Sequence, residues 1–243
     1  MKSWLLILLR IFMNDGIEIT LNKLRMVVFD CDGTIVDSQR AIVEIMQASF
    51  ELHNLKLPER NEIIWGVGLD LSVAIKRLLP ERHGLDINEL CKTYRIIAAD
   101  YRENRRFEDP LYPDAESVIR KLHADDWLLG VATGKSRAGL DHVLKLHNLS
   151  QLFITKQTSD CAAGKPNPEM LKNAMRDTGV SSELLFMVGD TTYDICMAVN
   201  AGTHAIGVSW GYHGIEELLQ AGAEIIVHNY DELFTFLRES LEN

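Results

Sequence analysis

Two carboxylates, Asp30 and Asp32, follow directly on a short apolar run and are separated only by Cys31. In an extended chain, side chains two positions apart lie on the same face, so the two acids project together and Cys31 points away. Carboxylates this close repel each other unless a cation lies between them or one of them holds a proton. We interpret the pair as part of a metal site that also contains an acid able to transfer protons.

The apolar run before the two acids covers residues 26–29, and Gly33 provides a turn after them. A short apolar run that ends in a turn is typical of a buried strand in a parallel sheet. Ligands of open α/β sheets bind outside the carboxyl ends of the strands, which is where Asp30 and Asp32 would lie. We therefore expect this strand to position the pair.

Further polar residues suited to phosphate or metal chemistry occur where predicted strands end or helices begin. They are Thr133 with Gly134 and Lys135, then Lys165, and finally Gly189-Asp190 with Asp194. In a parallel sheet the carboxyl ends of the strands meet at one edge, so residues far apart in the sequence converge there. We predict that these segments form one site with the two acids.

Helical patterns and short apolar runs alternate after residue 110. The predicted strands cover about 127–133, 152–154, 184–188, 205–208 and 224–227, and the predicted helices cover about 114–124, 137–147, 168–178, 194–200, 215–220 and 231–241. Strands that alternate with helices at this spacing predict an α/β fold with a doubly wound parallel sheet.

The segment 40–109 has helical patterns without a convincing strand. Asp37-Ser38 is a good N-cap pair for a first helix, and further helices are expected at about 69–79 and 87–101. We predict an all-helical cap at 40–109, inserted into an α/β core formed by 24–39 and 110–243. Residues 1–23 are expected to be an N-terminal extension outside the fold.

Composition narrows the class of partner and the compartment. The 243 residues carry a formal net charge of -10, which argues against nucleic acid or an anionic membrane as the main partner. The apolar stretch near the N-terminus is shorter than the ~20 residues that span a bilayer. The four cysteines contain no CxxC pair, so a reducing cytoplasm is expected. Monomer and homodimer both stay open.

The segment 30–34 (Asp-Cys-Asp-Gly-Thr), Thr133, Lys165, and Gly189-Asp190 with Asp194 together resemble the four motifs of the haloacid dehalogenase superfamily. The helical insertion directly after the first strand resembles the phosphoglycolate phosphatase-like branch of that superfamily. The resemblance covers roughly residues 26–240. It implies a Rossmann-like core, a Mg²⁺ cofactor and a small phosphorylated metabolite as the substrate.

The residue types fit the roles that the resemblance implies. Asp30 would attack phosphorus to give an acyl phosphate, while Asp32 would protonate the leaving alcohol and later deprotonate the attacking water. Thr133 and Gly134 would bind phosphoryl oxygens through a hydroxyl and backbone N–H groups. Lys165 would place a positive charge against the nucleophile and the phosphate.

The resemblance also implies the metal ligands. Asp190 would hold Mg²⁺, a hard cation that prefers oxygen ligands, together with Asp30 and the carbonyl group of Asp32. Asp194 is expected to be a second carboxylate on the metal side, acting through water, or a helix N-cap, or both.

Hydrolysis of a small phosphate monoester is the leading interpretation. A dehalogenase is disfavoured because the resemblance places an acid, Asp32, where dehalogenases lack one. A phosphosugar mutase similar to β-phosphoglucomutase, or a pyrophosphatase, could use the same core. A non-catalytic module would predict the loss of at least one of the motif residues, and none is lost.

The substrate itself is not determined by these motifs. Candidates for pairing a second anionic group, such as the carboxylate of phosphoglycolate, are Arg40, Lys76, Arg105 and Arg106. The segment 66–68 (Gly-Val-Gly) is either a simple turn or a substrate loop that faces the site. The segment 208–212 resembles the one after the fourth motif in phosphoglycolate phosphatases and related pyrophosphatases.

Overall fold

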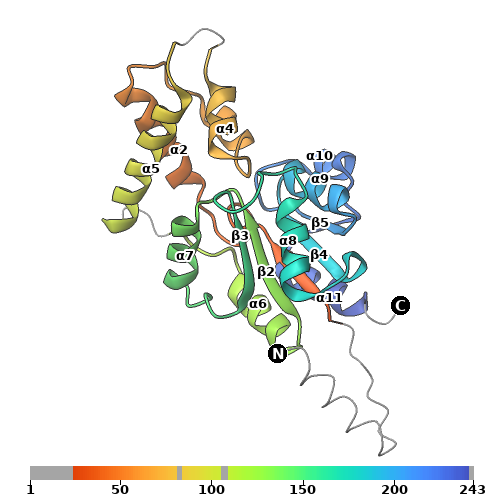
Figure 1. Ribbon diagram of the computed structural model, residues 1–243. Helices are drawn as coiled ribbons and strands as arrows, with labels where there is room; N and C mark the ends of the chain where they lie inside the picture. The colour runs from red at the N-terminus through yellow and green to blue at the C-terminus, as the bar shows by residue number, and fades with distance from the viewer. Residues whose placement is uncertain (1–23, 81–83, 105–108, 241–243) are drawn as a thin grey trace, which may run out of the picture.

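The computed structural model describes residues 24–80, 84–104 and 109–240 of the chain. Its centre is a six-stranded sheet in the order β3-β2-β1-β4-β5-β6, with every neighbouring pair parallel (Figure 1). The strands are β1 (Met26–Phe29), β2 (Leu128–Thr133), β3 (Phe153–Thr158), β4 (Leu185–Gly189), β5 (His204–Val208) and β6 (Ile225–Val227). The predicted doubly wound parallel α/β sheet is confirmed.

The strand order creates a switch point next to β1. The chain runs from β1 to β2 and β3 on one side, and then crosses to β4 on the other side of β1. Phe29 is paired with Val131 of β2 and with Val188 of β4, so the carboxyl ends of all three strands lie at the same edge of the sheet. Open α/β sheets bind their ligands at such a switch point, and Asp30 is the first residue beyond it.

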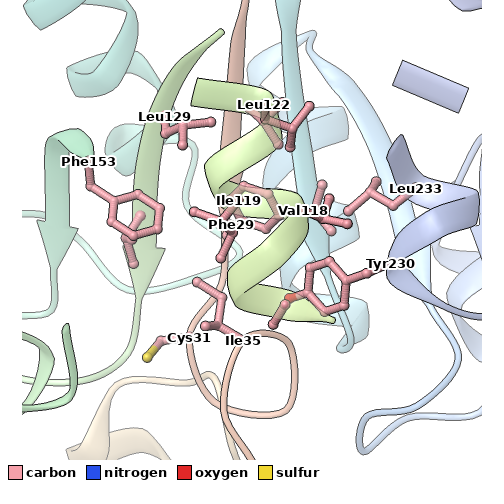
Figure 2. Packing of buried hydrophobic residues seen from close by; sticks show 14 of the residues in the cluster. Phe29, Cys31, Ile35, Val118, Ile119, Leu122, Leu129, Phe153, Tyr230 and Leu233 are labelled. Atoms are coloured by element: carbon pink, nitrogen blue, oxygen red, sulfur yellow. The ribbon is translucent and has the colours of Figure 1, made fainter. Parts of the chain in front are cut away.

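Helices cover both faces of the sheet, and β1 has no exposed side chain. Val27 and Phe29 belong to one hydrophobic cluster and Met26 and Val28 to another, as expected for a strand with alternating side chains. Figure 2 shows the first cluster, where Phe29 lies among side chains of β2, β3 and the helices of that face. The helices around the sheet are α6 (Ala115–Ala124), α7 (Arg137–Leu146), α8 (Glu169–Thr178), α9 (Thr192–Ala201), α10 (Ile215–Ala221) and α11 (Tyr230–Glu239), with a short 3-10 helix (Ser182–Leu184) before β4.

In the described part of the chain, four helices lie between β1 and β2 in the sequence and pack together to one side of the sheet (Figure 1). They are α2 (Gln39–Leu52), α3 (Arg60–Trp65), α4 (Leu71–Leu78) and α5 (Ile87–Glu103). Their shared hydrophobic cluster is separate from the two clusters of the sheet, and its buried members are Met46, Phe50, Ile63, Ile75, Leu90 and Cys91. The sequence did not predict α3, because a six-residue helix that buries only Ile63 and Ile64 has too few turns to show a periodic pattern.

The observed β3 is longer than the predicted run 152–154, because its second half is polar. Thr155 and Gln157 are buried, and their side chains both donate hydrogen bonds to Asp177 Oδ2, at 3.1 and 3.0 Å. Buried polar groups with such partners carry little penalty. The sequence pattern shows the polarity but not the partner, so the strand was predicted too short.

Some expectations fall on residues outside the described part of the chain. They include the N-terminal extension at 1–23 and the last residue of the predicted helix 231–241, while the described helix ends at Glu239. Within the described residues, no helix has the length and apolar character needed to cross a bilayer.

Candidate active site

The loop after β1 presents Asp30 and Asp32 at the carboxyl edge of the sheet. Asp30 is fully buried and Asp32 nearly so. The backbone N–H of Cys31 donates to Asp30 Oδ1 at 2.6 Å, while Asp30 Oδ2 is buried without a hydrogen-bond partner. Cys31 itself points into the first hydrophobic cluster, as the alternation of the chain predicted. Asp30 therefore offers one fixed oxygen and one oxygen available to a ligand.

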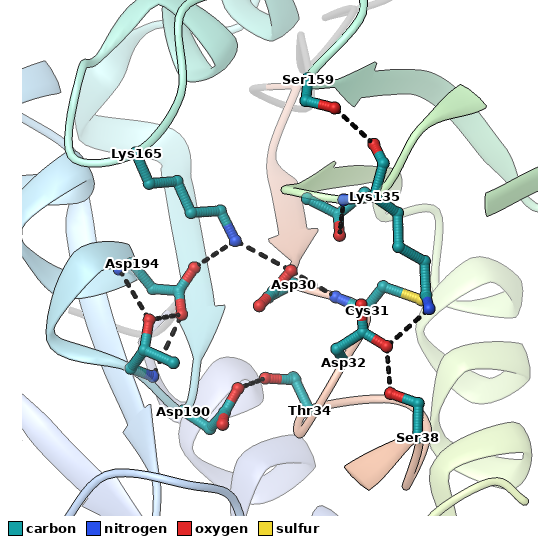
Figure 3. A network of polar contacts seen from close by, with 12 residues as sticks. Asp30, Cys31, Asp32, Thr34, Ser38, Lys135, Ser159, Lys165, Asp190 and Asp194 are labelled. Atoms are coloured by element: carbon teal, nitrogen blue, oxygen red, sulfur yellow. Dashed lines mark hydrogen bonds and ion pairs between the residues drawn. The ribbon is translucent and has the colours of Figure 1, made fainter. Parts of the chain in front are cut away.

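Lys165 lies between Asp30 and Asp194 (Figure 3). Its Nζ is 2.8 Å from Asp30 Oδ1 and 2.5 Å from Asp194 Oδ1, and all three side chains are fully buried. Burial opposes the charge of Lys165, yet Asp194 and Asp30 together raise the pKa of this ammonium group. Burial raises the pKa of Asp30 to about 7, against the opposite effect of Lys165.

Asp190 follows β4 and is held from two directions. Thr34 Oγ1 donates to Asp190 Oδ1 at 2.8 Å, and the backbone N–H of Tyr212 donates to Asp190 Oδ2 at 2.9 Å. A Cβ atom at Gly33 or at Gly211 would overlap the Asp190 side chain, so both neighbours must be glycine for the carboxylate to keep this position. Burial, with repulsion from Asp30, raises the pKa of Asp190 well above its ordinary value.

Asp30, Asp190 and Asp194 each place a carboxylate oxygen within 4.8 Å of the others. Three buried carboxylates against the single ammonium of Lys165 leave two negative charges when all are ionised. Buried charge of this kind is stable only when it is paired or binds a metal, and Mg²⁺ prefers oxygen ligands. With the unpartnered Asp30 Oδ2, the cluster fits a divalent cation. Asp32 is not part of the cluster.

The structure changes the interpretation of Asp194. The N-cap of α9 is Thr191, and Asp194 is the third helical residue of a capping box, in which its Oδ2 accepts from the Thr191 N–H and hydroxyl at 3.1 and 2.6 Å. The alternative interpretation of Asp194 as itself the N-cap is therefore wrong, while its predicted place on the metal side stays a prediction. Since Asp194 Oδ1 contacts Lys165, both oxygens are in use, and Asp194 also positions that lysine.

Asp32 lies on the other side of Asp30, with partners that the sequence did not predict (Figure 3). Lys135 Nζ is 2.7 Å from Asp32 Oδ1, and Ser38 Oγ donates to the same oxygen. Ser38 was expected to cap α2 with its side chain, but it makes no capping hydrogen bond, because its hydroxyl is turned to Asp32. The only sequence signal for Lys135 is its place after Thr133-Gly134.

Thr133 and Gly134 lie at the end of β2, beside the loop that carries Asp30 and Asp32. Thr133 is buried, and its Oγ1 accepts from the Lys135 N–H at 3.2 Å, so its hydroxyl hydrogen remains able to donate. Gly134 faces the carbonyl oxygens of Gly68 and Leu69, at 3.0 and 2.8 Å from the position of a Cβ. This contact joins the core to the helical insertion.

A cavity of about 350 Å³ lies between the helical insertion and the sheet edge, and Asp32 is part of its lining. The segment Gly66–Leu69 also lines it, which favours the interpretation of 66–68 as a substrate loop. Neither Arg40 nor Lys76, two of the expected anion-binding residues, is among the lining residues of the described chain. Arg105 and Arg106 lie outside the described residues.

The chain is similar in sequence to known hydrolases and phosphatases. A family described as haloacid dehalogenase-like hydrolase matches residues 27–208. A probable phosphatase IndB of Dickeya dadantii is 31% identical over 211 residues, which cover 86% of this chain and 91% of that protein. A pyrophosphatase PpaX of Halalkalibacterium halodurans is 29% identical, over 87% and 95%. A phosphoglycolate phosphatase of Aliivibrio fischeri is 23% identical, over 88% and 96%.

Solved structures show the same fold. A predicted phosphatase from Clostridium acetobutylicum has a TM-score of 0.78 at 25% sequence identity, with 89% of this chain and 99% of that chain covered. The match spans the helical insertion as well as the sheet, since it leaves out only about a tenth of this chain.

Proposed function

Because the chain belongs to the haloacid dehalogenase-like hydrolase family and its named relatives are phosphatases, we propose that it hydrolyses a small phosphate monoester with Mg²⁺ through an aspartyl-phosphate intermediate. The arrangement of Lys165 between Asp30 and Asp194 carries this proposal. A buried ammonium group against a buried carboxylate with one unpartnered oxygen is suited to a nucleophile that must approach an anionic phosphoryl group.

Asp30 and Asp190 would hold the cation, with Asp194 and the carbonyl group of Asp32 completing the set that the family resemblance implies. When bound, Mg²⁺ would supply positive charge to the phosphoryl oxygens and help to orient the ester. Thr133 and Gly134 would bind the phosphoryl oxygens by donating hydrogen bonds from the hydroxyl and the backbone N–H.

The two half-reactions use Asp30 and Asp32 in turn. A carboxylate oxygen of Asp30 forms a bond to phosphorus while the bond from phosphorus to the leaving oxygen breaks, and Asp32 gives that oxygen its proton. Asp32 then takes a proton from a water molecule, whose oxygen attacks phosphorus. The bond from phosphorus to Asp30 breaks, which releases phosphate and restores the carboxylate. Lys135 and Ser38 would hold Asp32 in place for both proton transfers.

Two further proposals concern the cellular location and the domain boundaries. All four cysteines are free, which supports a cytoplasmic location. We also propose the boundaries 24–39 and 110–243 for the catalytic core and 40–109 for the helical cap that closes over the site.

The test is phosphate release from 4-nitrophenyl phosphate and from a panel of phosphoglycolate, sugar phosphates, nucleotides and pyrophosphate. Release should need Mg²⁺ and stop with EDTA. Asp30→Asn should lower kcat by at least ~10³-fold, because an amide cannot act as the nucleophile. Asp37→Asn is the matched control, since Asp37 is exposed and, among the described residues, its carboxylate accepts one hydrogen bond, from the N–H of Gln39. Substantial Mg²⁺-dependent release by Asp30→Asn would rule out this mechanism.

The same panel separates the alternatives. A phosphosugar mutase would interconvert two sugar phosphates, visible by phosphorus NMR, with little free phosphate. A pyrophosphatase would release phosphate from pyrophosphate well above the rate with any monoester.

A further inference from the structure

We propose that the leaving alcohol of the substrate carries an apolar body of several carbon atoms, which binds in the cavity between the helical cap and the core. This inference rests on the proposed phosphatase function and names the substrate class for that same site. It disfavours phosphoglycolate and pyrophosphate, whose leaving groups are small and anionic.

The cavity begins at the acid that would protonate the leaving oxygen. Asp32, Ser38 and Lys135 are among its lining residues, so a group attached to that oxygen has the cavity next to it. The cap side of the cavity is mostly hydrophobic, with side chains from α2 and from the segment 63–74, which are Ala41, Ile42, Ile45, Met46, Ile63, Val67, Leu69, Leu71 and Ala74. Small-molecule pockets are generally lined in this way by apolar groups with a few placed polar groups.

Among the described residues, the walls that α2 and the segment 63–74 contribute to the cavity have no charged side chain. Lys135 is paired with Asp32 at 2.7 Å. Among the described residues, the other basic side chains in the lining lie away from α2, with the exposed Arg95 and the half-buried Arg102 on α5 and His142 on α7. A carboxylate or phosphate placed against the walls of α2 would lose its hydration without gaining a partner, which is costly.

The size of the cavity points in the same direction. A volume of about 350 Å³ is far larger than a two-carbon acid requires, since a single water molecule takes up ~30 Å³ in the liquid. An apolar body bound there would remove its own surface from water and gain affinity in proportion to the apolar area that becomes buried.

The experiment measures kcat/KM for ethyl, butyl and hexyl phosphate, whose leaving alcohols have nearly the same acidity but different apolar length. We expect kcat/KM to rise by up to about fourfold per added CH₂ group, and hexyl phosphate to exceed phosphoglycolate and pyrophosphate. A flat series, or a preference for either anionic leaving group, would overturn the inference while leaving the phosphatase function intact. No release from any ester, 4-nitrophenyl phosphate included, would overturn the proposed function and this inference with it.

A substitution in the cavity tests whether the apolar part of the substrate binds there. Ala98 lies on α5 and lines the cavity, so Ala98→Phe should fill part of it and lower the ratio of hexyl to ethyl phosphate kcat/KM by about tenfold. Ile96→Phe is the control on the same helix, because the Ile96 side chain is 60% exposed and is not part of the lining, and it should keep the ratio. An unchanged ratio in folded Ala98→Phe would place the apolar group elsewhere and contradict the proposal.

Discussion

Lys165 is the residue on which the charge balance of the site depends. Its ammonium group is the cation that contacts both Asp30 and Asp194 in a region without solvent exposure. Removing one partner of a buried ion pair leaves the other charge buried and uncompensated. The resulting loss of stability is larger than the net stabilisation that the pair provided. Here the remaining carboxylates would also repel Asp190 in the same cluster.

Lys165→Met should therefore lower the free energy of unfolding by ~3–5 kcal/mol without divalent cation and abolish turnover. Because Mg²⁺ could replace part of the missing positive charge, it should raise the Tm of this variant by more than it raises that of the wild type. Thermal melts with EDTA and with Mg²⁺ measure both effects. Lys172→Met, an exposed position on α8, serves as the control. Equal Mg²⁺ effects in Lys165→Met and the wild type would contradict the charge argument.

At the scale of the elements, the end of α3 contacts the core through a stack of aromatic rings. Trp65 lies flat on His213, with ring centroids 4.1 Å apart, and Tyr193 of α9 meets the same imidazole edge-on. The Tyr193 hydroxyl also donates to the Trp65 carbonyl oxygen at 3.0 Å. Arg77 of α4 donates to that hydroxyl at 2.6 Å, so two cap helices are held against α9.

The imidazole in this stack must be neutral. The N–H of Thr192 donates to His213 Nδ1 at 3.1 Å, and Nε2 lies 3.4 Å from the Trp65 carbonyl oxygen, which requires the proton on Nε2. Burial lowers the pKa of His213, although the Trp65 carbonyl, Asp194 and Glu217 act in the opposite direction, and Arg77 adds to the lowering.

The expected consequence is a loss of stability in mild acid. The unfolded chain takes up a proton at His213 near pH ~6.5, before the folded protein does, so stability falls as the pH falls below that value. Above pH ~6.5, His213 is neutral in both the folded and the unfolded chain and does not make the stability depend on pH. His213→Asn keeps an acceptor near Thr192 but cannot titrate. The Tm of this variant should therefore decrease less than that of the wild type when the pH is lowered from 8 to 5.5. Parallel curves for the two proteins would contradict this assignment.

At the scale of the whole molecule, the cap and the core have separate hydrophobic clusters. Phe50 is 1% exposed within the cap cluster, while the acids of the candidate site lie at the sheet edge between the two core clusters. The substrate cavity needs both parts, whereas the carboxylate cluster needs only the core.

Phe50→Ala should therefore separate substrate use from metal binding. The cavity it leaves should destabilise the cap by ~3–5 kcal/mol and lower kcat/KM for the longer alkyl phosphates. Mg²⁺ affinity, measured by titration calorimetry, should stay within about twofold of the wild type, since sites without shared partners act almost independently. Leu52→Ala on the same helix is the control, because Leu52 is 67% exposed. A parallel loss of Mg²⁺ affinity would show that the two parts are coupled.

The sequence by itself was sufficient for the features that are local in the chain. The apolar run before Asp30, the spacing of Asp30 and Asp32, and the alternation of strands and helices after residue 110 all lie within short windows. The side-chain period of a strand or helix and the chemistry of turns act over such windows. They were enough to predict the parallel sheet, the helical insertion and the residues proposed for the site.

Only the tertiary structure decided which of these residues meet and what surrounds them. The hydrogen bond from Thr34 to Asp190 joins positions 156 residues apart, and the pairing of Lys135 with Asp32 depends on β2 lying beside β1. Strand order and register bring these side chains together, and they result from packing over the whole chain rather than from any short window. The same holds for the lining of the cavity, because its walls come from the cap helices α2 and α5 and from α7 of the core, which only the tertiary structure brings together.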